Sequence, residues 1–180
     1  MKKLMFILAA VAMAASVQAA SVSWTCTNVK DGSGNAIDGI AYFVNAATLS
    51  QETLATYTKA SDFTTALSGM YSYTPSTAGK YTSAAVENAT LGLTDATASQ
   101  AYLVVFDTAT ITDTSHYYMT EVKDFNTLSG TYEQQVKWGS QSTPSQAAGA
   151  RKAVNVPEPT SGLLMLVGLA GLALRRGRRA

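Results

Sequence analysis

Apolar runs near both ends of the chain constrain it more strongly than any feature between them. At the amino end, Lys2 and Lys3 precede an apolar stretch, residues 4–15, and small residues then lead to Ala19. A basic start, a short apolar stretch and a small-residue exit are the three parts of a secretory signal peptide. About a dozen apolar residues are too few to span a bilayer comfortably. Residues 1–19 are therefore predicted to be a signal peptide that is removed by cleavage after Ala19.

The carboxyl end has three parts in a set order. A proline-containing element comes first: Val156, Pro157, Glu158 and Pro159. A run of apolar residues and glycine, residues 163–174, follows it. A basic cluster comes next: Arg175, Arg176, Arg178 and Arg179. Prolines disfavour helix at the residues before them, so the first part should be extended and accessible. The arginines should stay on the cytoplasmic side of the membrane, so both ends predict that the bulk of the chain is exported.

This tail, residues 156–180, resembles the PEP-CTERM sorting signal, in which a Pro-Glu-Pro element, a short hydrophobic helix and a basic cluster follow one another. The resemblance implies a membrane helix over residues 160–174. It also implies recognition by an exosortase, a membrane-embedded enzyme resembling a cysteine transpeptidase, which cuts near the Pro-Glu-Pro element. Twelve helical residues rise about 18 Å, against a hydrocarbon core of about 30 Å, so retention until processing is favoured over lifelong anchoring. The membrane is therefore an expected partner, transiently or as an anchor through the tail.

Between the two ends, the chain is long enough to form one domain with its own core. The whole-chain charge of +1 is misleading, because six of the 13 basic residues belong to the two ends. One of the 12 acidic residues, Glu158, also lies in the tail, so the middle has seven basic and eleven acidic residues, a net charge near −4. Without a basic patch, a nucleic-acid partner is not expected.

The middle is rich in Ser, Thr and Tyr, which favours sheet over helix. Six strands are predicted from alternation or short apolar runs: residues 21–27, 39–44, 70–74, 101–106, 117–122 and 131–138. Two short helices are predicted over residues 49–59 and 61–67. Residues 75–99 are compatible with a loop, a weak edge strand or a short helical piece. The predicted fold is a mainly β, mostly antiparallel sandwich over residues 20–138, with the helices at an edge. A flexible linker, residues 139–155, is expected to follow it.

The polar residues of the middle do not form a catalytic pattern. Cys26 is the only cysteine, so no disulfide can form within the chain, and we expect it to be a buried strand residue. His116 is the only histidine, and its neighbour Ser115 points to the opposite face if both lie on a strand. One His and one Cys cannot make a structural zinc site. Four carboxylates could in principle gather around calcium, but no calcium-loop pattern contains them: Asp107, Asp113, Glu121 and Asp124. No catalytic residue, metal or cofactor is expected.

Two classes of function fit these observations. The first is a structural, non-catalytic protein of the cell envelope, its outer surface or the extracellular matrix, exported through the inner membrane and delivered by the tail. The second is a surface carbohydrate-binding module, with polysaccharide as its partner and with tryptophans and tyrosines as a binding platform. An exposed aromatic row flanked by Asp or Asn would favour the second class. Tyrosines buried in the sheet would favour the first.

Overall fold

The computed structural model describes residues 19–31, 33–139 and 152–155, and their secondary structure is mainly β. The strands are β1 (Ser21–Thr27), β2 (Ala41–Asn45), β3 (Ser72–Tyr73), β4 (Lys80–Glu87), β5 (Ala98–Phe106), β6 (His116–Met119), β7 (Lys123–Asn126), β8 (Glu133–Trp138) and β9 (Lys152–Ala153). The helices are α1 (Gln51–Leu54), α2 (Ala60–Ala66) and the 3₁₀ helix η1 (Asn88–Leu91).

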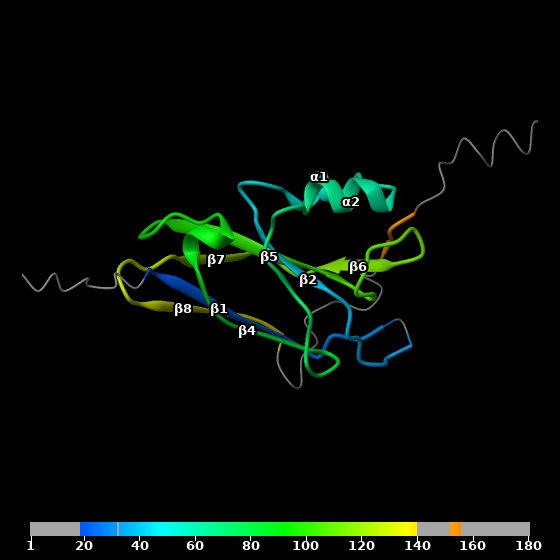
Figure 1. Ribbon diagram of the computed structural model, residues 1–180, viewed down its shortest axis with the longest axis horizontal. Helices are drawn as coiled ribbons and strands as arrows, with labels where there is room; N and C mark the ends of the chain where they lie inside the picture. The colour runs from blue at the N-terminus through cyan, green and yellow to red at the C-terminus, as the bar shows by residue number, and fades with distance from the viewer. Residues whose placement is uncertain (1–18, 32, 140–151, 156–180) are drawn as a thin grey trace, which may run out of the picture.

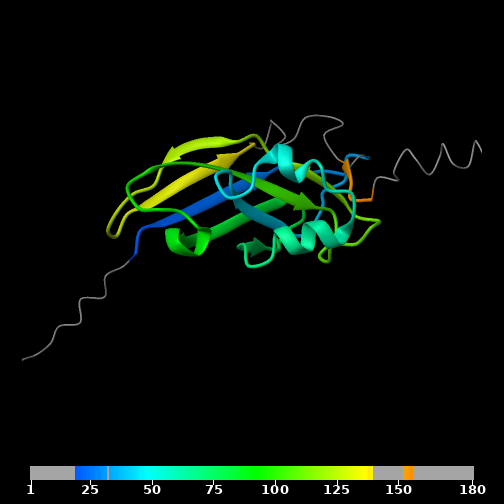
Figure 2. The ribbon, with the colours of Figure 1, turned by 90° about the horizontal axis from the view of Figure 1, so that it is seen from above.

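The strands form two facing sheets (Figure 1). The smaller sheet has the order β4-β1-β8, and the larger has the order β3-β2-β5-β6-β9, with β7 paired to the first half of β5. The pairings between these strands are antiparallel except for β1 with β8, which run parallel. Seen from above, most strands run roughly along the length of the molecule (Figure 2). The predicted mainly β, mostly antiparallel sandwich is therefore confirmed for this part of the chain.

An aromatic core fills the space between the two sheets. Residues alternate in burial along β1, so that every second side chain points inward, as predicted from its sequence pattern. Trp24 from β1 contacts Phe43 from β2 with ring centroids 6.5 Å apart, and Phe43 lies 6.3 Å from Trp138 of β8. These tilted and edge-to-face arrangements are the favourable ones for aromatic pairs. The smaller sheet is thus held to the larger one mainly by large apolar side chains.

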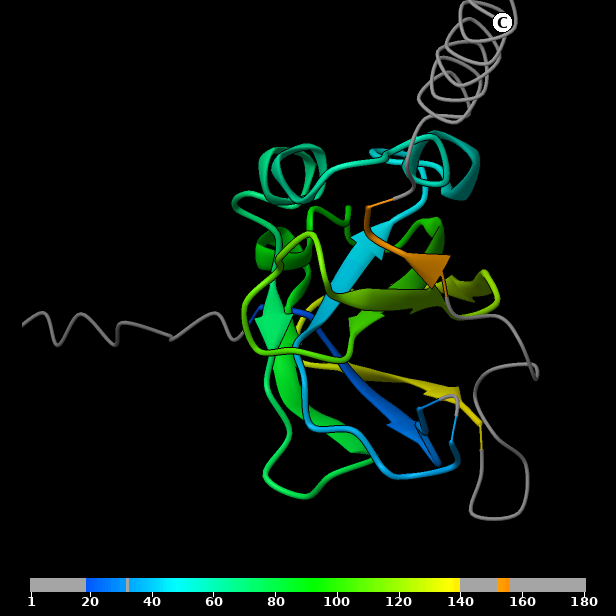
Figure 3. The ribbon, with the colours of Figure 1, turned by 90° about the vertical axis from the view of Figure 1, so that its right-hand side faces the viewer.

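A second core lies on the opposite face of the larger sheet, under α1 and α2. Phe63 of α2 is fully buried, and its ring centroid lies 4.7 Å from Tyr117 of β6 and 5.7 Å from Phe106 of β5. Figure 3 shows the two helices above the larger sheet, away from the smaller one. The short helices were predicted at an edge, and they lie instead on a sheet face. The reason is that β5 is apolar on both faces, so its outer face also needs a cover.

The interval 75–99, which the sequence left open, contains the edge strand β4 and then the helix η1. Only Tyr81 and Ser83 of β4 are buried, so the strand lacks the apolar alternation that marks most half-buried strands. The predicted strand 117–122 ends earlier, at Met119, and β7 was not predicted at all. The burial of β7 alternates, but Phe125 is its only large apolar residue, so the hydrophobic signal is weak.

The predicted linker, residues 139–155, is part of the fold at its far end. Residues 140–151 lie outside the described part, whereas Lys152 and Ala153 pair with β6. The neighbouring Val154 is fully buried in the second core. A flexible linker would not bury an apolar side chain, so residues 152–154 do not belong to one. The predicted signal peptide up to residue 18 and the predicted tail helix over residues 160–174 also lie outside the described part. Within that part, no helix combines the length and apolar character needed to cross a membrane.

Tyr102 of β5 ties the second core to the loop before α1. Its hydroxyl donates a hydrogen bond of 2.8 Å to the carbonyl oxygen of Leu49, and its side chain is fully buried. Burial raises the pKa of Tyr102, with smaller contributions from Glu52 and Tyr57, and burial also raises the pKa of Tyr42 and Tyr117. Because the folded state favours the neutral phenol, ionisation of these tyrosines opposes folding. Their contribution to the free energy of unfolding is complete below pH ~10 and is lost as the pH rises further.

Tyr102→Phe should lower the free energy of unfolding at pH 7 by about 1 kcal/mol, because the Leu49 carbonyl loses its hydrogen bond. Urea unfolding at pH 7 and above pH 10 should show a smaller difference at the higher pH, since the variant has no phenol to ionise there. Tyr132→Phe is the control, because the Tyr132 side chain is 68% exposed. An equal effect of both substitutions would contradict the assignment.

Candidate functional site

The predicted signal cleavage point lies directly before the first strand of the domain. Ala19 is partly exposed, whereas Ala20 is only 1% exposed. The Ala20 carbonyl accepts a 2.9 Å hydrogen bond from the backbone N–H of Asn88, and Ser21 N–H donates to the carbonyl of Tyr132 at 3.2 Å. The hydrogen-bonded structure of the domain therefore begins at Ala20. Cleavage after Ala19 would make this same residue the new amino end.

The segment before the sorting element is fixed on the larger sheet. Figure 3 shows β9 beside β6. The backbone N–H of Val154 donates to the Ser115 carbonyl at 2.9 Å, and its side chain lies in the second core. The sorting residues Val156, Pro157, Glu158 and Pro159 and the arginines Arg175, Arg176, Arg178 and Arg179 follow outside the described residues. The Pro-Glu-Pro element thus begins three residues after a residue packed in the core.

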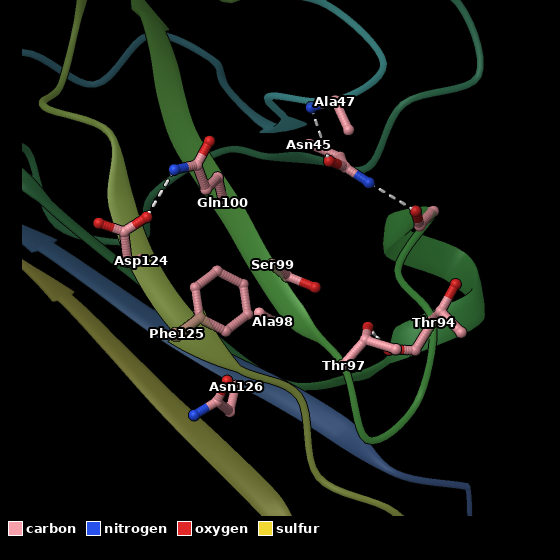
Figure 4. Close-up of a pocket in the computed structure, with 11 residues that line it drawn as sticks. Asn45, Ala47, Thr94, Thr97, Ala98, Ser99, Gln100, Asp124, Phe125 and Asn126 are labelled. Carbon is pink, nitrogen blue, oxygen red and sulfur yellow. Dashed lines mark hydrogen bonds between the residues drawn. The ribbon is translucent and has the colours of Figure 1, made fainter.

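A polar groove of about 570 Å³ among the described residues is a candidate binding surface for a small ligand. It lies where β7 pairs with β5, beside the end of β2 and the loop after η1 (Figure 4). Its polar lining comes from amide, carboxylate and hydroxyl side chains: Asn45, Thr94, Thr97, Ser99, Gln100, Asp124 and Asn126. Since these residues are spread over some eighty positions, the sequence pattern gave no sign of the groove.

Hydrogen bonds made by two side chains, Asn45 and Gln100, hold the shape of the groove. The Asn45 amide donates to the Gly92 carbonyl at 2.7 Å, and its oxygen accepts from Ala47 N–H at 3.0 Å (Figure 4). Gln100 donates to Asp124 at 2.6 Å across the two strands. These bonds fix donors and acceptors in place without a histidine or a cysteine. The groove can therefore offer hydrogen bonds to a neutral polar ligand, but it holds no nucleophile paired with a base.

Aromatic side chains contribute little to this groove or to the rest of the described surface. Phe125 is the only aromatic residue that lines the groove, and it is partly buried against the core between the sheets. Trp24, Trp138 and four tyrosines are nearly or fully buried: Tyr81, Tyr102, Tyr117 and Tyr118. Tyr132 alone among the described large aromatics is strongly exposed. The exposed aromatic row expected of a carbohydrate platform is not formed by the described residues.

Cys26 and His116 lie in unrelated environments. Cys26 is fully buried on β1, as predicted, with its sulfur 3.5 Å from the Tyr118 hydroxyl. His116 is on the surface, 53% exposed, with Nδ1 3.3 Å from an oxygen of Asp107. Ser115 is fully buried, and its hydroxyl hydrogen bonds to Thr108 and to the backbone of Thr112. Ser115, His116 and Asp107 are therefore not arranged as a catalytic triad.

The four carboxylates considered for calcium are each engaged separately. Asp107 pairs with His116, and Asp113 accepts a 2.9 Å hydrogen bond from Ala60 N–H at the start of α2. Glu121 forms an ion pair with Lys123, and Asp124 pairs with Gln100. In the part of the chain that the structure describes, no three His, Cys, Asp or Glu side chains are grouped so as to bind a metal ion.

Comparison with known proteins identifies one feature of the chain. The family model of the PEP-CTERM protein-sorting motif matches residues 155–179, which contain the Pro-Glu-Pro element, the apolar run and the arginines. The chain therefore carries this sorting motif at its carboxyl end, as its sequence predicted. No curated protein and no solved structure matches the chain.

Val154→Ala should lower the free energy of unfolding by about 2 kcal/mol, because it leaves a cavity in the second core. Lys152→Ala on the same strand is the matched control, and its exposed side chain should change the value by less than about 0.5 kcal/mol. Urea unfolding of the two variants measures the difference. Equal values would mean that the segment before the sorting motif is not packed against the sheet.

Proposed function

We propose that the chain is a structural, non-catalytic protein of the cell envelope or extracellular matrix, exported with a cleavable signal peptide and processed by an exosortase. The observation that carries the proposal is the sorting motif over residues 155–179. This motif implies export through the inner membrane toward the cell surface, with the tail in contact with the membrane and with the exosortase. The structural role and the final location go beyond what the motif implies and are part of the proposal.

The positions of the two processing points support this proposal. Ala20 is the first residue bonded into the smaller sheet, and Val154 is packed into the second core shortly before the Pro-Glu-Pro element. Removal of residues 1–19 and cleavage near Pro157 would therefore leave every described strand in place. Signals that flank a domain without contributing strands to it are suited to removal after export.

The surfaces of the domain support a structural role over catalysis. Along β1, small hydroxyl residues face outward, and β8 and β4 carry further polar side chains beside them. Register places Thr25 between Thr82 on one side and Lys137 on the other. Such a face is hydrated and forms hydrogen bonds, as a contact surface within a hydrated polymer requires. Most of the tyrosines of the sheets are buried, and tyrosines buried in the sheet were expected of a structural protein.

The alternative, a carbohydrate-binding module, is supported by the groove between β5 and β7. Its fixed amides and carboxylate could hydrogen bond to sugar hydroxyl groups, and Phe125 supplies one apolar surface. A groove with one partly buried aromatic ring favours a short polar ligand over an extended chain stacked on a platform.

Replacement of Pro157 and Pro159 by Ala should block processing, because the element would then favour helix. Intact-mass measurement on protein from the native host should show that the double variant retains residues 160–180 in the membrane fraction. The unaltered protein should have lost both the signal peptide and the tail. Lys152→Ala, outside the matched residues, is the control and should be processed normally. Normal processing of the double variant, or an unaltered protein that keeps its tail, would contradict the proposal.

The groove is tested by affinity electrophoresis of the protein in gels containing polysaccharide from the host's own matrix. If the alternative holds, Gln100→Ala should abolish retardation, since it removes the contact with Asp124 and one donor to the ligand. Tyr132→Ala, at an exposed ring outside the groove, should leave retardation unchanged. If no such polysaccharide retards the unaltered protein, the carbohydrate-binding alternative is contradicted and the structural role is the remaining candidate.

A further inference from the structure

Asn88, at the start of η1, holds a buried acceptor that lacks a partner. The residue is 1% exposed, and its Nδ2 donates to Asp95 at 2.7 Å and to the Leu128 carbonyl at 3.4 Å. Within the described part of the chain, its Oδ1 accepts no hydrogen bond although it is shielded from solvent. The contact with the Asp95 carboxylate identifies the donating nitrogen, so the oxygen is the unsatisfied atom. A buried acceptor without a donor loses its hydration without compensation, so the structure should provide a donor for it in the mature protein.

The backbone of Ala20 lies directly opposite Asn88. The register of β1 and β4 pairs Ser21 with Glu87, and the next pair is joined by the Asn88 N–H donating to the Ala20 carbonyl. Hydrogen-bonded residues in an antiparallel pair normally exchange two such bonds. Here the Asn88 carbonyl accepts from Leu93 N–H at 2.9 Å instead. The nitrogen of Ala20 therefore faces Asn88, but its usual acceptor, the Asn88 carbonyl, is already bonded to Leu93.

Each element next to this position carries an acidic residue, but only one of these residues contacts Asn88. Glu87 of β4 and Glu133 of β8 are the register partners of Ser21 on its two sides, and Asp95 follows η1 and holds the Asn88 amide. Tyr132 accepts the Ser21 N–H through its carbonyl, and its own side chain is exposed. Glu87 and Glu133 share the outer face of the sheet with Ser21, whereas Ala20 and Asn88 are buried on the other face. Asp95 is therefore the carboxylate beside Asn88, and Asn88 Oδ1 is the buried acceptor on the residue opposite Ala20.

We propose that removal of the signal peptide creates a structural cation: the α-ammonium group of Ala20, bound by Asn88 Oδ1 with the carboxylate of Asp95 beside it. Hydrolysis of the Ala19–Ala20 bond consumes one water molecule. The Ala19 carbonyl carbon becomes a carboxylate on the released peptide, and the Ala20 amide nitrogen keeps the electron pair of the broken bond and becomes an ammonium. Processing therefore replaces one N–H donor by three on a group that can rotate toward Asn88.

This inference rests on the cleavage after Ala19 that the proposed function includes. Its consequence is that the domain is more stable after processing than before, without any change in its strands. The effect has a definite dependence on pH. A free α-amino group normally has a pKa of about 7.7–8.0, and the Asn88 acceptor together with the Asp95 carboxylate should raise the pKa of the Ala20 α-amino group in the folded state. Because the folded value is raised, the stabilisation is complete below pH ~8 and is lost as the pH rises through the folded pKa.

The test compares two chains in detergent, one from Ala20 to Ala180 and one that starts five residues earlier, at Ala15. An NMR titration of the α-amino group should give a pKa about one unit above its usual range in the first chain and a normal value in the second. The unfolding equilibrium constants should differ about tenfold more at pH 6 than at pH 10, with the first chain the more stable. Asp95→Asn in the first chain should move the α-amino pKa back toward its usual range.

A normal α-amino pKa in the chain from Ala20, together with equal stabilities of the two chains at both pH values, would overturn the inference. Sequencing of the amino end of the exported protein tests the cleavage point separately. An end other than Ala20 would contradict that part of the proposed function, while the titration would still report on the network around Asn88.

Discussion

The structure depends on burying both faces of β5. Its residues 101–106 are all inaccessible, and they alternate between the core shared with the smaller sheet and the core under α2. The same strand pairs with β2, β6 and β7, so most of the larger sheet is assembled on it. At about 25 cal/mol per Å² of apolar surface, two covered faces supply a driving force that the chain, with its single cysteine, does not obtain from disulfides.

The sequence predicted the parts of the fold in which hydrophobic pattern and burial agree. The alternation along residues 21–27 gave β1 with its correct bounds, and the apolar run at residues 101–106 marked the central strand. Cys26 was expected in a strand interior and is found there. The sorting motif was predictable for a different reason, because its three parts are adjacent in the chain and need no tertiary structure to be recognised.

The remaining features arise from contacts between distant segments. Helix α2 covers a sheet face because β5 needs a cover there, and the sequence of the helix does not contain this information. β9 has two residues, too few for any periodicity, and is fixed by the burial of Val154. The groove joins β2, β5 and β7, and the acceptor on Asn88 is recognised only once Ala20 lies opposite it. Local sequence patterns do not predict contacts between segments that are distant in the chain.

The parallel pairing of β1 with β8 has a consequence for the order of events at the membrane. β1 is the central strand of the smaller sheet, but its parallel neighbour β8 is more than a hundred residues later in the chain. Contacts between such distant segments form slowly, and they cannot form until the second segment is present. In the proposed export, which begins at the amino end, β1 would therefore stay unpaired on one side until β8 had also crossed the membrane.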